Sequence, residues 1–143
     1  MDVYVVGVHG ESSQVTAWST ASVGGVHLDK SLSDSILLPT RVEVEQESQQ
    51  RAQAVVRAKG SMPFGMGAAV ASICASIVLD KRNVRSVSHY QPEFGCYFSL
   101  PAVLGRGGIV KSMVVPLSAE EGARVTDAAA QVRNQMDKLR KTL

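Results

Sequence analysis

The chain has 143 residues, of which 45% are hydrophobic and 20% charged, and its formal net charge at pH 7 is +2. This length is typical of one domain with its own core, and this hydrophobicity excludes an intrinsically disordered chain. The charge is too small and too evenly spread to indicate nucleic acid as a partner. The first ten residues, MDVYVVGVHG, carry an acid at position 2 and only a short apolar run. They predict neither a signal peptide nor a membrane anchor, and we expect a cytoplasmic protein.

The N-terminal third mixes extended and helical patterns. Residues 3–8 (VYVVGV) predict a short strand that is buried on both sides, and a chain that begins inside such a strand is expected to be a fragment or a truncated form. The small residues and the pair Gly24 and Gly25 in TAWSTASVGGVHL favour an extended or irregular connection over a helix. Residues 41–59 have helical spacing, and Gly60 stands where a helix would end.

A second helix is predicted after an interruption. Pro63, Gly65 and Gly67 in SMPFGMG are expected to loosen the chain, because proline lacks a backbone donor and glycine lacks a Cβ. Apolar residues then recur at helical spacing and predict a stripe that faces the core. The stripe consists of Val70, Ile73, Cys74, Ile77 and Val78. In this apolar setting Cys74 is predicted to be a buried, reduced thiol, which indicates a reducing compartment.

The second half of the chain predicts a sheet and a final helix. Three strand candidates follow one another, VRSVSHY, CYFSLPAVL and IVKSMVVPL, and the glycine-rich turn GRGG joins the last two. Ser118 and Glu121 form a capping-box pattern ahead of a C-terminal helix. The apolar face of that helix comprises Val125, Ala129, Val132, Met136 and Leu139. The predicted fold class is therefore α+β, an antiparallel sheet covered by long helices, over residues 1–143.

Three stretches in this order carry a resemblance to a known family. They are VVGVHGESS with Trp18 shortly after, RAKGSMPFGMGAAVASICASIVLDKRNVRSVS, and FSLPAVLGRGGIVKSMVVPLSAEEGARV. Together they resemble the C-terminal, substrate-binding domain of the L-lactate/malate dehydrogenase family. They also resemble the lactate dehydrogenase-like domain that is fused to a ubiquitin-conjugating-enzyme variant.

The resemblance implies an NAD-dependent oxidoreductase that moves hydride between nicotinamide and the carbon of a 2-hydroxy acid. His9 then corresponds to the histidine that exchanges the hydroxyl proton, a role that suits imidazole because it titrates near neutral pH. Glu11 is a candidate local partner, since side chains at i and i+2 of an extended chain point the same way. Met62 corresponds to a substrate-contacting position, and Met66 to one that faces the nicotinamide. The alternatives are an exposed loop histidine at position 9 and methionines that only pack the helix break.

Departures from the family pattern define what the chain lacks. It contains no glycine-rich phosphate loop, and the GRGG segment at 105–108 is predicted to be a hairpin turn. The arginine that grips the substrate carboxylate and the aspartate that orients the histidine have no match, and Val8 replaces a common glutamate. We therefore expect the isolated chain to be inactive without a dinucleotide-binding half, and the full-length form to be a homo-oligomer.

Several further expectations follow from the same residues. The alternative to a dehydrogenase part is a non-catalytic truncated isoform or degenerate relative that acts as a binding domain. No metal site, nucleic-acid partner or membrane partner is expected. His27 and His89 match no functional position of the family and are predicted to be surface or structural histidines.

Overall fold

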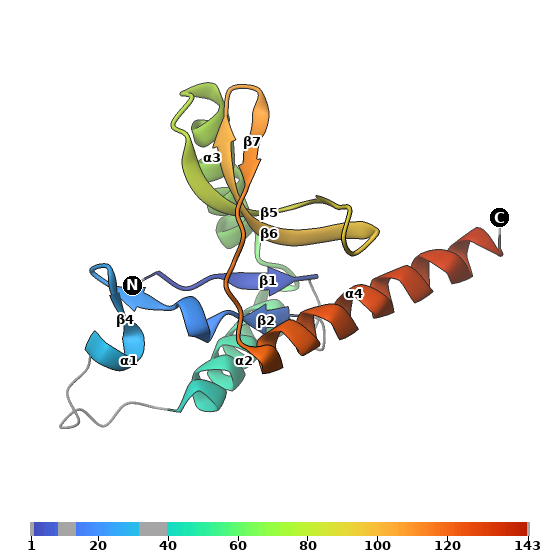
Figure 1. Cartoon of the computed structure of the whole chain (residues 1–143), viewed down its shortest axis with the longest axis horizontal. Coiled ribbons are helices and arrows are strands. Elements are labelled where there is room, and N and C mark those ends of the chain that lie inside the picture. Colours follow the sequence, from blue (N-terminus) through green and yellow to red (C-terminus); the bar gives the residue numbers. More distant parts are fainter. Residues whose placement is uncertain (1, 9–13, 32–39, 143) are drawn as a thin grey trace. The chain divides into compact units, whose positions relative to one another are not determined.

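The computed structural model describes residues 2–8, 14–31 and 40–142, drawn as a coloured ribbon in Figure 1. The chain divides into two compact units, which are taken separately below. Unit 1 comprises Met1–Ser31, Ser86–Ala102 and Ser112–Leu143, and unit 2 comprises Leu32–Arg85 and Val103–Lys111.

An antiparallel sheet forms the centre of unit 1. Strand β1 (Val5–Gly7) pairs with β2 (Gln14–Thr16) and, through Gly7 and Ser99, with β6 (Cys96–Gly105). The strand order is β2-β1-β6-β5, where β5 is Asn83–Gln91, and β7 (Gly108–Ser112) also pairs with β6. The strand predicted over residues 3–8 is present as β1 but spans only residues 5–7, and it is not buried on both sides, because Val5 is exposed. The last predicted strand ends at Ser112, five residues earlier than the pattern indicated.

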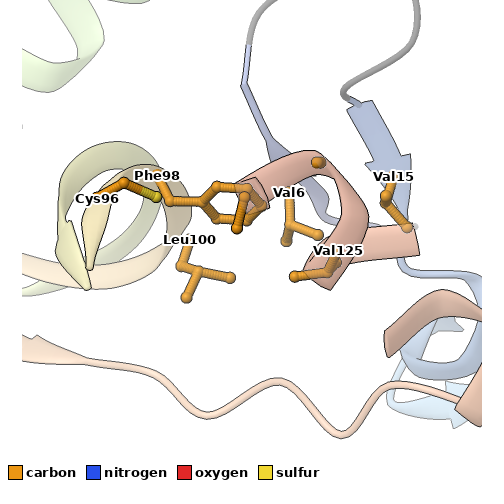
Figure 2. Packing of buried hydrophobic residues seen from close by; sticks show 8 residues of the cluster. Val6, Val15, Cys96, Phe98, Leu100 and Val125 are labelled. Atoms are coloured by element: carbon orange, nitrogen blue, oxygen red, sulfur yellow. The ribbon is translucent and has the colours of Figure 1, made fainter. Parts of the chain in front are cut away.

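The core of unit 1 lies between this sheet and helix α4 (Ala119–Arg140). Strand residues of one face meet the apolar face of α4, and the ring of Phe98 points toward Val6 in Figure 2. The buried members are Val6, Val15, Cys96, Phe98, Leu100, Val125, Ala128 and Ala129. The predicted α+β class and the predicted apolar face of the C-terminal helix are confirmed, except that Leu139 is exposed.

The start of α4 is tied to a segment one hundred residues earlier in the chain. Ser118 caps the helix by accepting from the Glu121 N–H at 3.2 Å, and the Ser118 N–H donates to the Glu121 carboxylate at 2.9 Å. That carboxylate also accepts from the Ser19 N–H at 3.0 Å and from the Ser19 hydroxyl. Ser19 belongs to the 3-10 turn η1 (Trp18–Thr20). The predicted capping box is therefore also a tertiary link within unit 1.

The charge of Glu121 sets how this link depends on pH. Burial, the largest single influence, raises the pKa of Glu121, but the hydrogen bonds from Ser19 and Ser118 together outweigh it and hold the pKa below its ordinary value of 4.5. A carboxyl whose pKa is lower in the folded than in the unfolded state stabilises the fold above its unfolded pKa. This contribution is lost as the pH falls through 4.5 toward the lower folded pKa.

Replacing Glu121 by glutamine is expected to lower the free energy of unfolding at pH 7 by about 1–3 kcal/mol, because charge-assisted hydrogen bonds to a buried group are lost. The difference between wild type and variant shrinks as the pH falls below 4.5, where the wild-type carboxyl takes up a proton. Urea unfolding of wild type and variant, at pH 7 and at a pH below 4.5, measures this difference. Glu120→Gln, at an exposed position of the same helical turn, is the matched control. An equal loss in both variants would refute the role of the Ser19 link.

Residues 16–28 form an irregular connection with short extended pieces, as predicted. A two-residue hairpin joins β3 (Ser22–Val23) to β4 (Val26–His27). Gly24 and Gly25 have φ values of 58° and 83°, the left-handed geometry that a tight hairpin turn requires. The short helix α1 (Leu28–Ser31) follows β4.

Unit 2 contains two consecutive helices. Helix α2 (Arg41–Lys59) begins at a capping box between Thr40 and Glu43 and ends at Gly60, whose φ is 74°. This confirms the helix and the end that were predicted. Helix α3 (Pro63–Val78) starts at the proline, so the interruption is shorter than predicted. Proline is well tolerated at the first helical position, because the N–H that it lacks would have no partner there.

The burial predicted for α3 is wrong in this chain. Val70, Cys74 and Val78 of the predicted core stripe are exposed, and Ile73 and Ile77 are only half-buried. The only buried residue of α3 is Ser76, whose hydroxyl donates to the Ser72 carbonyl. A helix that is apolar on all sides normally packs against other elements on all sides. In the described part of the chain, however, most side chains of α3 are exposed.

In unit 2, a hydrogen bond joins the turn after α3 to the turn between β6 and β7. The carboxylate of Asp80 accepts from the Arg106 N–H at 2.9 Å, and this bond holds the pKa of Asp80 below its usual range. Asp80 and Arg82 both have positive φ, 45° and 52°. A Cβ at Gly105 would lie 2.7 Å from Asp80 Oδ1 and 2.9 Å from a methyl of Val110, so any other residue there would require both side chains to shift.

Candidate functional site

The candidate site begins at the break between α2 and α3. Met62 is the N-cap residue of α3 and is half-buried, with φ −115° and ψ 58°, and its thioether makes no capping hydrogen bond. Met66 lies one turn later, is 60% exposed, and donates its N–H to the Met62 carbonyl at 3.1 Å. The structure thus brings these two predicted site residues together.

The side chains around the two methionines are apolar and open to solvent. Phe64 is 83% exposed, and the Lys59 ammonium lies 5.9 Å from the centre of its ring, within the range of a cation–π contact. At Gly65 and Gly67 an added Cβ would meet nothing within 4 Å. The segment therefore offers an apolar surface with one cation beside it. Thioethers and a phenyl ring shape a binding surface and carry no proton that catalysis uses.

His9, the predicted proton donor and acceptor, lies outside the described residues, as does Glu11. The described chain reaches Val8, which packs against the core of unit 1, and resumes at Gln14 in β2. The positions of His9 and of Glu11 in the candidate site therefore stay predictions.

The other two histidines have structural hydrogen bonds. His89 Nδ1 lies 2.9 Å from the Val87 carbonyl, and its Nε2 lies 2.9 Å from the Ser112 hydroxyl and 2.7 Å from the Gln91 amide nitrogen. His27 Nε2 lies 2.8 Å from the Ser19 carbonyl. The prediction that His27 and His89 are structural or surface residues is confirmed.

In residues 2–8, 14–31 and 40–142, no three side chains of His, Cys, Asp or Glu gather in a way that would hold a metal ion. No single helix of these ranges is long and apolar enough to cross a membrane. Helices α2 and α3 reach the length and hydrophobicity of a membrane-spanning segment only when they are taken together, and a bend of 117° separates them.

The family profile for the lactate/malate dehydrogenase alpha/beta C-terminal domain matches residues 1–143, the whole chain. The chain belongs to the lactate/malate dehydrogenase family. Among its relatives, the L-lactate dehydrogenase of Deinococcus radiodurans is 32% identical over 133 residues, which cover 91% of this chain and 43% of that enzyme. L-lactate dehydrogenase A of Rhizopus oryzae is 32% identical over 131 residues, covering 92% of this chain and 40% of that enzyme.

The L-lactate dehydrogenase 1 of Bifidobacterium longum is similar over a longer stretch, at 32% identity over 143 residues that cover 95% of this chain and 45% of that enzyme. The chain thus spans less than half the length of these relatives. What it shares with the lactate/malate dehydrogenase family is the C-terminal domain. The segment 105–108 is the turn between β6 and β7, as predicted, and not a phosphate-binding loop.

Sequence reasoning missed two side chains of the candidate surface, Phe64 and Lys59. The run PFGM beside the Lys-Gly pair was the available signal, because a phenyl ring next to an exposed methionine extends the same apolar surface. The sequence pattern predicts Lys59 at the end of a helix and Phe64 in the break that follows it, and neither pattern predicts exposure. Phe64 lies between Met62 and Met66, and Lys59 lies beside its ring, so both belong to the candidate binding surface.

Proposed function

We propose that this chain is the substrate-binding part of an NAD-dependent 2-hydroxy acid oxidoreductase of the lactate/malate dehydrogenase type. The observation that carries the proposal is the family match over all 143 residues, together with L-lactate dehydrogenases as relatives. His9 would serve as proton donor and acceptor, Met62 as the substrate contact and Met66 as the contact to the nicotinamide. We further propose a cytoplasmic location.

The residues of this chain fit one part of a dinucleotide site. The exposed surface of Phe64 and Met66 at the start of α3 suits an apolar ring, whereas no glycine-rich loop in these 143 residues suits the diphosphate. NAD, when bound, supplies the hydride acceptor or donor. His9 would hold or release the proton of the substrate hydroxyl, and Met62 would limit the size of the substrate. The proposed activity therefore needs a dinucleotide-binding domain beside this one.

The substitution Met62→Thr is expected to increase the use of pyruvate by about tenfold in kcat/KM, because a shorter side chain at the N-cap of α3 leaves room for a small 2-oxo acid. Initial rates with a series of 2-oxo acids of increasing size measure the effect. Wild type should prefer the larger, more apolar acids of that series. The assay uses the chain together with a dinucleotide-binding domain.

Thermal unfolding is followed in parallel, because threonine at an N-cap also accepts from helix N–H groups and stabilises by about 0.5–1 kcal/mol. Met113→Thr makes the same methionine-to-threonine change at an exposed residue outside the candidate surface and is the matched control. If no 2-oxo acid is used better by Met62→Thr than by the control, Met62 only packs the helix break.

A second function, a non-catalytic binding domain, is favoured by the exposure of α3. Phe64, Met66, Val70 and Val78 are 83%, 60%, 55% and 67% exposed. Exposed apolar surface of this extent is typical of an interaction site. A dehydrogenase part would cover it with its own cofactor domain, whereas a binding domain would offer it to another protein.

The intact mass of the native polypeptide distinguishes the two functions. The polypeptide is recovered from its source with an antibody against α4, weighed, and assayed for NADH oxidation with 2-oxo acids. A mass well above 15.2 kDa with NADH oxidation supports the dehydrogenase. A mass of 15.2 kDa without oxidation supports the binding domain and refutes the enzymatic proposal.

A further inference from the structure

Two turns of unit 2 are fixed together at one end of that unit (Figure 1). In the turn after α3, the Lys81 N–H donates to the Ser76 carbonyl at 3.0 Å. The turn between β6 and β7 is tied to it, because the Arg106 N–H donates to the Asp80 carboxylate at 2.9 Å. The side chains of both turns therefore form one surface. This tip surface comprises residues 78–82 and 105–111.

The tip surface projects into solvent and carries apolar side chains. An added Cβ at Gly107 would meet nothing within 4 Å. Leu79 and Val110 are 64% and 55% exposed, and their chain neighbours Val78 and Ile109 are exposed as well. A single exposed apolar residue is common at a protein surface, whereas a group of them on two adjoining turns indicates an interaction site.

The charges of the tip surface are mostly basic. It carries Lys81, Arg82, Arg106 and Lys111 against one acid, Asp80, which gives a net charge of +3. The Asp80 carboxylate accepts from the Arg106 N–H and pairs with Arg82 at 3.3 Å. Asp80 and Arg106 are 26 positions apart, so these basic residues gather only in the fold. The even spread of charge along the sequence therefore did not indicate a membrane partner.

Exposed apolar side chains beside basic ones are typical of surfaces that dock on anionic lipid. The apolar side chains enter the headgroup region, and the aliphatic stems of lysine and arginine follow while their charged ends stay at the lipid phosphates. An acidic protein would match the same charges. The tip surface has only 12 residues, however, whereas a typical protein interface takes about 20–30 from each partner. The size of the surface therefore favours lipid.

We propose that the tip surface is a docking site for an anionic lipid surface, in which Leu79 and Val110 enter the headgroup region and the basic side chains contact the lipid charges. Each basic residue near such a surface strengthens binding about fivefold. Four of them give peripheral, reversible docking that depends on salt. The inference does not depend on the proposed enzymatic role.

The test measures binding of the 143-residue chain to vesicles of phosphatidylcholine and phosphatidylserine, in a ratio of about 2:1, by sedimentation with increasing lipid. Lys81→Glu with Lys111→Glu should bind about tenfold or more weakly than wild type, because anionic lipid then repels both positions. Leu79→Ser with Val110→Ser keeps the charge and should bind about fivefold more weakly, because less apolar surface enters the headgroup region. Unchanged binding of either variant would overturn the proposal.

Lys138→Glu with Lys141→Glu makes the same change of charge in unit 1 and is the matched control, expected to bind as wild type does. Vesicles of phosphatidylcholine alone should not retain the chain, and salt of about 1 M should weaken binding to the mixed vesicles. Far-UV circular dichroism confirms folding of each variant.

Three outcomes would contradict lipid docking at the tip surface. They are an equal loss in the α4 control, binding to both kinds of vesicle alike, and no binding to the mixed vesicles. Polyglutamate tests the acidic protein partner in the same assay conditions. If the chain binds polyglutamate more tightly than the mixed vesicles, the surface belongs to an acidic protein and the proposal is overturned.

Discussion

Replacing His9 by glutamine is expected to lower the turnover of a 2-oxo acid by about 10²- to 10⁴-fold, the range that positioned proton transfer contributes. Glutamine keeps hydrogen-bonding groups of similar size but cannot carry a proton through a catalytic cycle near neutral pH. The measurement is steady-state NADH oxidation by the protein that includes a dinucleotide-binding domain. Binding of NADH, followed by its fluorescence, should stay nearly unchanged, because His9 is proposed to act on the substrate.

His27→Gln makes the same substitution at a histidine with a structural hydrogen bond to Ser19, and it should leave turnover near the wild-type value. The pH profile adds a readout that a structural role would not move. The change in kcat/KM that a titrating histidine produces near neutral pH should vanish in His9→Gln and persist in the control. Unchanged turnover in His9→Gln would remove this residue from the mechanism.

Phe98→Ala is expected to lower the free energy of unfolding of the 143-residue chain by about 3–5 kcal/mol. The Phe98 side chain is fully buried between β1 and α4, and its ring centre lies 5.5 Å from that of Phe94 (Figure 2). Removing it leaves a cavity lined by Val6 and Val125 that neighbouring side chains fill only in part. Since domains of this size are stable by about 5–15 kcal/mol, the loss is a large share of the total.

Phe64→Ala is the matched control, because the same atoms are removed from a ring that is 83% exposed. Its effect should stay within about 0.5 kcal/mol. Urea unfolding followed by far-UV circular dichroism measures both variants. A similar loss in the two would show that Phe98 does not anchor the core.

The sequence predicted the helix ends well, because their signals are local. Gly60 adopts the left-handed conformation that ends α2, and Ser118 and Glu121 are three residues apart, so each signal lies within one helical turn. The strand at the N-terminus and the turn at 105–108 were predicted for the same reason.

Features that depend on distant segments were not predictable. The Ser19–Glu121 link joins residues 102 positions apart, and no pattern in either segment announces it. The apolar stripe on α3 predicted burial, but burial also requires another element that packs against the helix. The spacing of apolar residues does not show which element that is. For the candidate site, the resemblance singled out Met62 and Met66, whereas their spacing of one helical turn and the exposure of Phe64 required the structure.

The contact between Asp80 and Gly105 has an evolutionary consequence. The carboxylate occupies the space of the missing Cβ, so neither position can change alone without a steric or hydrogen-bonding loss. Alanine at position 105 requires both the Asp80 carboxylate and the Val110 side chain to shift, whereas Asp80 can be replaced at the cost of the hydrogen bond from the Arg106 N–H. We therefore expect position 105 to change only after positions 80 and 110 have changed, while position 80 can change first.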